Sequence, residues 1–254
     1  MAPSPAPRAD YGNWVAMRLV AVPALAGLAT IASSFLWPWS WVLAAVLLSC
    51  AAYFVYARYC FSPRGKDVQA KIVGRLLDHV GPESAGTALD IGCGNGAVAI
   101  RLALRCPRLT VHGVDTWGRG WEFGKSDCER NAEAEGVARR TVFRPASAAS
   151  LPYEDGAFDL VVSNLAFHEV RDAGERARAL NEALRVLSKG GRFVLQDLFL
   201  WKRAYGPTAE LLEWFRSAGV ERVAIVETAH EPFIPKLLKP PFMVGTIAVI
   251  HGTK

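Results

Sequence analysis

Charged side chains are absent between Arg18 and Arg58. Two apolar runs, Leu19–Trp37 and Trp39–Ala57, fill this interval, and Pro38 separates them. Each run has about 19 residues, close to the roughly 20 that an α-helix needs to cross a bilayer. Neither run has a polar face, which argues against an amphipathic helix lying on a membrane surface. A pair of buried helices in a soluble protein stays open as an alternative, although such helices usually carry polar residues on one side.

The two runs predict a membrane hairpin over residues 1–60, with transmembrane helices at about 15–37 and 39–59. A cleaved signal peptide does not fit, because the apolar stretch is too long and a second run follows it. Basic residues flank the hairpin and are missing from its turn, so the positive-inside rule places both termini and the rest of the chain in the cytoplasm. These residues are Arg8, Arg18, Arg58, Arg64, Lys66, Lys71 and Arg75.

Paired cysteines and histidine clusters are also lacking. The five cysteines are odd in number, and none forms a C-x-x-C pair. This usage predicts a reduced, cytosolic catalytic part with no disulfide framework and no metal site. The net charge of +5 is small and dispersed, and no arginine-rich tract occurs, so nucleic acid is not an expected partner.

Residues 61–254 alternate between strand and helix patterns, which predicts an α/β domain with a doubly wound, mostly parallel sheet. We expect Gly190 and Gly191 to stop a helix. Two final strands, Val223–Glu227 and Met243–His251, have no helix between them and suggest an antiparallel end pair. The expected strands before them are Thr87–Ile91, Thr110–Asp115, Thr141–Arg144, Phe158–Ser163 and Arg192–Asp197.

A glycine-rich loop follows the first of these strands in the segment "LDIGCGNG". Gly92, Gly94 and Gly96 let the backbone approach a ligand, and the helix that follows offers free N–H groups. Asp115, at the end of the next strand, is placed to bind two ribose hydroxyls. The same loop also fits the dinucleotide fingerprint, so a nicotinamide-dependent oxidoreductase stays open on this evidence.

Three further segments decide between these cofactors. Asp90 stands where nicotinamide proteins usually carry an apolar residue, and the chain continues with "LPYEDGAFDLVVSNLAFHEV" and "ALRVLSKGGRFVLQDLF". In this order the motifs resemble the class I S-adenosylmethionine-dependent methyltransferases over about residues 66–254. The resemblance implies a Rossmann-like, seven-stranded sheet with an antiparallel last strand inserted beside the strand that ends at Asp197.

The resemblance also implies a cofactor site for S-adenosyl-L-methionine. Asp90 would face the methionine amino group, and the three glycines would pass under the methionine and ribose. Asp115 would hold the ribose hydroxyls, with Thr116 and Trp117 beside the adenine. Asn164 would lie near the methionine part. Many members have Asp-Ala where this chain has Ser147 and Ala148, so the usual acidic contact to the adenine amino group is replaced by serine.

Ligands of open α/β sheets bind at the carboxyl ends of the strands. His168, Glu169 and Asp197 lie there and are the candidates for catalysis, with His168 favoured as a base because it titrates near neutrality. The predicted function is methyl transfer to a small-molecule acceptor, which is either lipophilic and membrane-resident or water-soluble. A non-catalytic cofactor-binding subunit of a membrane complex stays an alternative.

Overall fold

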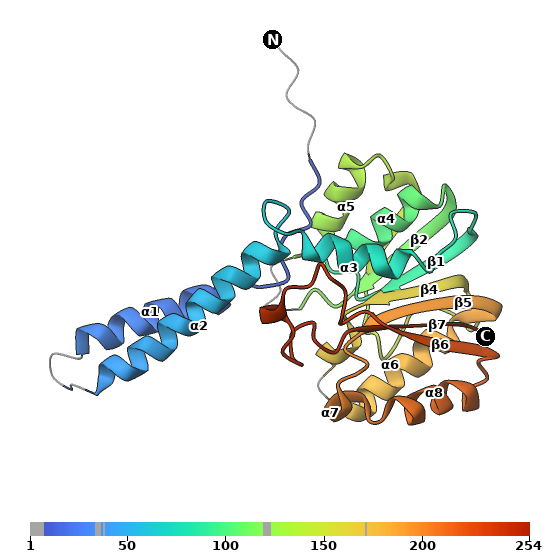
Figure 1. The fold of residues 1–254 in the computed structure, drawn as a ribbon. Coiled ribbons are helices and arrows are strands. Elements are labelled where there is room, and N and C mark those ends of the chain that lie inside the picture. Colours follow the sequence, from blue (N-terminus) through green and yellow to red (C-terminus); the bar gives the residue numbers. More distant parts are fainter. Residues whose placement is uncertain (1–7, 34–36, 38, 119–122, 171) are drawn as a thin grey trace, which may run out of the picture. The chain divides into compact units, whose positions relative to one another are not determined.

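The computed structural model describes residues 8–33, 37, 39–118, 123–170 and 172–254 (Figure 1). Its contacts divide the chain into two compact units. One holds residues 1–11, 73–234 and 239–254, and the other holds residues 12–72 with the short segment 235–238. Residues 8–11 therefore group with the α/β unit, whereas the sequence predicted a hairpin over residues 1–60.

The α/β unit is built on one seven-stranded sheet in the order β3-β2-β1-β4-β5-β7-β6. Strands β1 to β5 pair in parallel, and β7 lies antiparallel between β5 and β6. The mostly parallel sheet and the inserted antiparallel strand were both expected. The strands are β1 (Ala85–Ile91), β2 (Arg108–Asp115), β3 (Thr141–Pro145), β4 (Phe158–Asn164), β5 (Leu187–Asp197), β6 (Arg222–Glu227) and β7 (Ala248–Thr253).

Helices cover both faces of this sheet (Figure 1). On one face lie α4 (Ala97–Arg105) and α5 (Lys125–Ala134), and on the other lie α6 (Ala173–Arg185) and α8 (Thr208–Ser217). The main hydrophobic core forms under α6 and α8, where Phe193 of β5 stacks on Phe215 of α8 with ring centroids 5.4 Å apart. Two further helices are α3 (Val68–Leu77) and the short α7 (Lys202–Tyr205).

The predicted helix stop at Gly190 and Gly191 is wrong. Helix α6 ends at Arg185, and both glycines lie inside β5. The C-terminus draws them into the strand, because Gly190 donates its N–H to the carbonyl of Lys254 and Gly191 accepts from the N–H of the same residue. The last strand is also shorter than expected. It begins at Ala248, since residues 241–246 form turns on the carbonyl of Pro240.

Two antiparallel helices, α1 (Met17–Ser33) and α2 (Ser40–Phe61), form the hairpin of the second unit. Among the described residues, only α2 is long and apolar enough to cross a membrane, while α1 is a shorter apolar helix. Residues 34–36 and 38 lie outside the described part, so the predicted turn and the end of the first predicted helix are not described. Two transmembrane helices remain a prediction.

Small side chains occupy the contact between α1 and α2. Gly27, Ala44 and Ala51 are buried, and a Cβ at Gly27 would come within 2.9 Å of Leu48. Several large apolar side chains are instead exposed, as at Leu25, which is 67% exposed, and Val46, which is 61% exposed. This distribution is the reverse of a soluble core and is typical of helix pairs in lipid.

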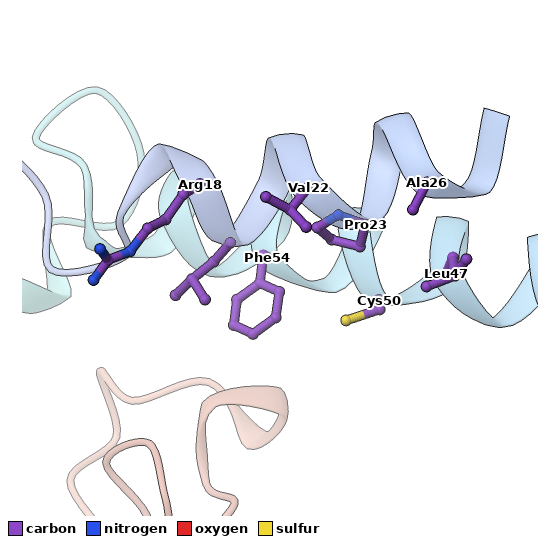
Figure 2. A pocket seen from close by; sticks show the side chains of 8 residues that line it. Arg18, Val22, Pro23, Ala26, Leu47, Cys50 and Phe54 are labelled. Carbon is purple, nitrogen blue, oxygen red and sulfur yellow. The ribbon is translucent and has the colours of Figure 1, made fainter. Parts of the chain in front are cut away.

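A shallow apolar groove of about 380 Å³ runs along the hairpin (Figure 2). Arg18 lies at one end and Leu47 near the other, with Pro23 and Phe54 between them. Arg18 is the only charged side chain among its lining residues, which also include Leu19, Val22, Ala26 and Cys50. The groove therefore continues the apolar surface of the helices almost to their charged end.

Candidate active site

The glycine loop joins the end of β1 to the start of α4, as predicted from the motif. Gly92, Gly94 and Gly96 all have positive φ angles, which glycine adopts without strain. A Cβ on Gly92 would lie 2.2 Å from the Cβ of Ala166, so this position has no room for a side chain. Nothing described lies within 4 Å of a Cβ built on Gly94, so the loop is open there.

Asp90 lies fully buried beneath this loop. One carboxylate oxygen, Oδ2, accepts the N–H of Ala99 in the first turn of α4 at 3.0 Å, and the other, Oδ1, has no partner among the described residues. Burial raises the pKa of Asp90 to about 7, and the nearby charge of Asp115 adds to this rise against the Ala99 hydrogen bond. A cationic group placed at Oδ1 would stabilise the ionised carboxylate.

Asp115, at the end of β2, holds the loop from its other side. Its Oδ2 accepts the N–H of Gly94 at 2.9 Å, and its Oδ1 accepts the N–H of Trp117 at 3.0 Å. Trp117 has a φ of 40°, which is rare for a bulky residue, and its indole N–H donates to the carbonyl of Gly94 at 2.7 Å. Thr116 between them is exposed. The predicted ribose and adenine residues thus surround the glycine loop.

The remaining predicted cofactor residues follow β3 and end β4. Ser147 accepts the N–H of Ala149 with its Oγ at 3.2 Å, and Ala148 packs against the core cluster. Asn164 is the last residue of β4, and its buried Oδ1 has no partner among the described residues. Leu165 next to it has a φ of 55°, so the chain turns sharply where β4 leaves the sheet.

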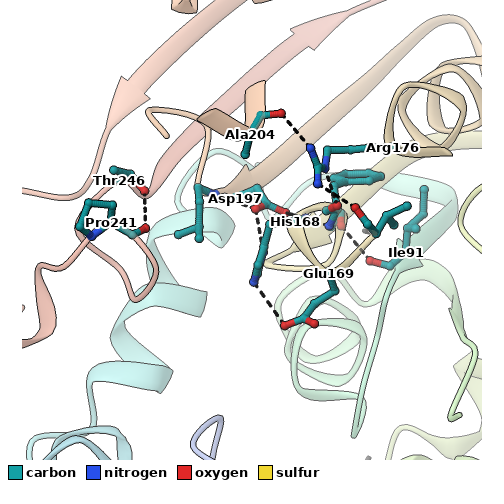
Figure 3. A network of polar contacts seen from close by, with 12 residues as sticks. Ile91, His168, Glu169, Arg176, Asp197, Ala204, Pro241 and Thr246 are labelled. Atoms are coloured by element: carbon teal, nitrogen blue, oxygen red, sulfur yellow. Dashed lines mark hydrogen bonds and ion pairs between the residues drawn. The ribbon is translucent and has the colours of Figure 1, made fainter. Parts of the chain in front are cut away.

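His168 and Asp197 meet at the carboxyl ends of β4 and β5 (Figure 3). His168 Nδ1 lies 2.8 Å from Asp197 Oδ1, and its Nε2 lies 3.4 Å from Glu169 Oε1. The Asp197 side chain is completely buried, and its oxygens also accept the backbone N–H groups of Phe167, His168 and Leu198. Asp197 therefore orients the His168 ring from its buried side, while Glu169, with a side chain 55% exposed, contacts the ring from the solvent side.

Two opposing effects set the protonation of His168. Burial alone would lower its pKa, but the charge of Asp197 and the hydrogen bonds to Asp197 and Glu169 outweigh burial and raise the pKa of His168 to about 10. His168 consequently holds both ring protons at neutral pH. This differs from the neutral imidazole that a general base requires.

Arg176 of α6 fixes the segment that carries His168, and sequence reasoning missed it. Its guanidinium donates to the carbonyls of Phe167 at 3.2 Å, Val170 at 2.8 Å and Ala204 at 2.8 Å. Figure 3 shows it reaching Ala204 beside the His168 cluster. A sequence motif cannot predict this positioning role, because all three partners of Arg176 are backbone carbonyls.

Asn131 of α5 is a second residue that the sequence did not reveal. It is fully buried, and its amide donates to the carbonyls of Asp10 at 2.8 Å and Asn95 at 3.1 Å, while its oxygen accepts the N–H of Asp10 at 2.8 Å. Asn95 in the glycine loop donates in turn to the carbonyl of Tyr11. The segment before the hairpin is thereby tied to the cofactor loop.

The donor and acceptor groups of this site fit S-adenosylmethionine. The unpaired oxygens of Asp90 and Asn164 suit an ammonium group, and the open backbone at Gly94 leaves space beside them. Each oxygen of Asp115 accepts one N–H and can accept a second hydrogen bond, as from a ribose hydroxyl. Across the described residues no group of three metal-ligating side chains occurs.

Comparison with known proteins supports the same cofactor. A family model described as a methyltransferase domain matches residues 89–195, which run from β1 into β5. Residues 89–195 thus match the methyltransferase domain family. This match supports S-adenosylmethionine, the cofactor predicted from the sequence, rather than a nicotinamide.

Curated relatives share this domain. The chain is 33% identical over 164 residues to 27-O-demethylrifamycin SV methyltransferase of Amycolatopsis mediterranei, covering 63% of this chain and 56% of the relative. It is 29% identical to the O-methyltransferase rstn1 of Aspergillus nomiae over 67% of this chain and 73% of the relative. A demethylmenaquinone methyltransferase of Thermus thermophilus is 37% identical over 48% of this chain and 52% of its own length. The chain thus spans little more than half of the first relative.

Solved structures share the fold. A geranyl diphosphate methyltransferase in complex with SAM aligns with a TM-score of 0.54 at 18% identity, over 74% of this chain and 85% of its own. The YcgJ protein from Bacillus subtilis aligns with a TM-score of 0.50 at 18% identity, over 72% of this chain and 98% of its own. At this identity the likeness concerns the α/β fold alone.

Proposed function

We propose that the protein is an S-adenosylmethionine-dependent methyltransferase anchored in a membrane, with its catalytic domain in the cytoplasm and a lipophilic small molecule as its methyl acceptor. The observation that carries the anchoring is the reversed hairpin, with Gly27, Ala44 and Ala51 inside and Leu25 and Val46 outside. In water this exposed apolar surface would favour aggregation, whereas in a bilayer the apolar lipid chains would surround it at no such cost.

The charges around the hairpin support its orientation. Arg18 lies in the first turn of α1, and Arg58 lies in the last turn of α2, so these basic residues are at the same end of the antiparallel pair. Trp37, Trp39 and Trp41 lie at the opposite end and are exposed, as expected of an aromatic belt at an interface. The basic end faces the cytoplasm under the positive-inside rule.

The acceptor is a small molecule in this proposal. Two relatives are named for 27-O-demethylrifamycin SV and demethylmenaquinone, which are small organic molecules. A hairpin in the membrane would hold the catalytic domain where lipophilic molecules of this size collect. A water-soluble acceptor is the competing possibility, and it would leave the hairpin as an anchor only.

The site also suggests how the chain assists methyl transfer. S-Adenosylmethionine supplies an activated methyl group, so the protein mainly positions the two reactants. His168, which keeps its proton at neutral pH, donates a hydrogen bond rather than accepting the proton of the acceptor. In this proposal Glu169, the more exposed partner of His168, takes up that proton.

A label-transfer experiment tests this function. The full chain in detergent is incubated with S-adenosylmethionine labelled in the methyl group and with whole-cell extract separated into lipid and aqueous fractions. We expect label in the lipid fraction with the wild type and none with Asp115→Ala, whose carboxylate holds Gly94 and Trp117. Asp155→Ala, which removes an exposed surface carboxylate, is the matched control and should label normally.

The distribution of label separates the possibilities. Label in the aqueous fraction alone would overturn the lipophilic acceptor and leave the methyltransferase activity standing. No label in either fraction, with S-adenosylhomocysteine still bound, would favour a cofactor-binding subunit without catalysis.

A further inference from the structure

Three polar side chains with buried, unpaired atoms lie in one row on the sheet. Asp90 lies one residue before the end of β1, Asn164 ends β4 and Gln196 lies one residue before the end of β5. Asp90 pairs with Val162 of β4, and Asn164, two residues further on, pairs with Gln196. Paired residues of parallel strands, and residues two apart on one strand, point to the same face. The row therefore crosses three neighbouring strands on a single face.

Gln196 leaves the most hydrogen-bonding capacity unmet of the three residues, because both polar atoms of its side-chain amide lack a partner in the described part of the chain. It is 1% exposed, and neither Oε1 nor Nε2 has a hydrogen-bond partner among the described residues. Buried polar groups without partners lower stability, and native proteins seldom keep them without a ligand or an ordered water. A wholly apolar side chain of similar size, such as methionine, would avoid that loss.

The cofactor would explain the unpaired oxygens of Asp90 and Asn164, but it would not explain the unpaired amide of Gln196. Asp90 and Asn164 border the glycine loop, where the methionine part of S-adenosylmethionine is expected. Gln196 is one strand further from β1, with β4 between them. Beyond Gln196 the row continues to its partner Val249 on β7, which is apolar. Gln196 thus lies between the polar residues on β1 and β4 and an apolar residue on β7.

We infer that Gln196 binds the neutral oxygen-bearing head of the methyl acceptor, a hydroxyl or carbonyl group, whose apolar remainder extends toward β7. A primary amide both donates and accepts, which matches a hydroxyl or carbonyl group. The row contributes a carboxylate and two amides but no cation, so it does not favour a phosphate or carboxylate head. This inference rests on the proposed function and specifies its substrate class.

The test compares Gln196→Met with the wild type. The rate of methyl transfer from labelled S-adenosylmethionine to the lipid fraction is measured at increasing amounts of that fraction. The affinity for S-adenosylhomocysteine is measured separately. We expect the apparent KM for the acceptor to rise about tenfold or more, the scale of one buried hydrogen bond. Cofactor affinity should stay within twofold, and the melting temperature without ligand should be equal or higher.

A defined probe set makes the test independent of the natural acceptor. Protein saturated with S-adenosylhomocysteine is titrated with 4-pentylphenol, with its methyl ether and with 4-pentylbenzoate. The phenol should bind the wild type at least tenfold more tightly than it binds Gln196→Met, and the benzoate should bind both weakly. Thr141→Val, which removes a buried hydroxyl bonded to the carbonyl of Val137 at the amino end of β3, on the far edge of the sheet, should lower stability without changing phenol binding.

Each outcome has a distinct meaning. If wild type and Gln196→Met bind the phenol equally and show equal KM values, Gln196 is a structural residue and the inference is overturned. If the wild type transfers no methyl group to any fraction, the proposed function fails, whichever way the probe titration turns out. If the benzoate binds best, the acceptor head is anionic and the substrate class inferred here is wrong.

Discussion

The hairpin and the α/β unit place their large apolar side chains in opposite ways. In the α/β unit Phe193, Phe199 and Phe215 are completely or almost completely buried, and the surface carries the charges. Among the described residues from Met17 to Ala57, the buried ones are glycine and alanine, and leucine, valine and tryptophan are among the exposed ones. One chain thus contains two regions whose stability depends on different solvents, water for one and, in our proposal, lipid for the other.

The largest effect is expected from emptying the core of the α/β unit. Phe193→Ala leaves a cavity beside Phe215 and should lower the free energy of unfolding by about 3–5 kcal/mol. Leu25→Ala removes an exposed side chain from the hairpin and should change the unfolding of the α/β unit very little. Chemical denaturation of the full chain in detergent, followed by the signal of the α/β unit, measures both. Equal losses would mean that the two regions are not distinct.

A charge on the hairpin should have the next largest effect. Leu25→Lys places an ammonium group at an exposed position of α1, at a cost of about 2.5–3.5 kcal/mol if the position is near the centre of a bilayer. The protein should shift from the membrane pellet to the soluble or aggregated fraction after carbonate extraction. Leu104→Lys, at an exposed leucine of α4, is the control and should leave partitioning unchanged. Identical fractionation of both variants would argue against the membrane hairpin.

Alkaline pH should act on the α/β unit through His168. Its pKa in the folded protein, about 10, is above the ordinary value of 6.5, so the protonated form stabilises the fold. This stabilisation is fully present below pH 6.5 and is lost as the pH rises through about 10. We expect a loss of about 1.5–3 kcal/mol, typical of hydrogen bonds to charged groups, visible as a falling melting temperature. His168→Asn should remove this pH dependence, and an unchanged slope in that variant would assign it elsewhere.

A smaller pH effect is expected in cofactor binding. Asp90 has its pKa raised to about 7 by burial, so below that pH it holds a proton that a bound ammonium group would displace. Affinity for S-adenosylhomocysteine should therefore increase up to about tenfold between pH 6 and pH 8. In Asp90→Asn the affinity should be weaker and flat over this range. Calorimetric titration at several pH values measures both, and a flat wild-type profile would remove Asp90 from the ammonium contact.

Local patterns predicted the parts of the site that are close in sequence. Asp90 and the three glycines lie on one strand–loop–helix unit, so the loop could be located from spacing, and Asp115 followed from the end of the next strand. The role of Asp90 toward the methionine amino group was implied by the family resemblance. The order of the sheet, with β7 between β5 and β6, was expected from the family resemblance. The pairing of His168 with Asp197 was predicted only as a shared location at the strand ends.

Contacts between distant residues could not be predicted in this way. Asn131 bonds to Asp10, which is 121 positions away, and an asparagine in a helix gives no sign of such a partner. Gln196 appeared as an ordinary strand residue until the register set it beside Asn164. Gly190 and Gly191 were misassigned because the C-terminal carbonyl and N–H that draw them into β5 belong to Lys254, at the far end of the chain.

The bonds between Asn131 and Asp10 can form only after Asn131 has been synthesised, which has a consequence for folding during translation. Translation adds roughly 5–20 residues per second, so the 121 positions between the two residues take on the order of 6–24 seconds to synthesise. The hairpin is synthesised within that interval, while the segment around Asp10 still lacks its binding site. The final arrangement of this segment is thus assembled only after both hairpin helices have been made.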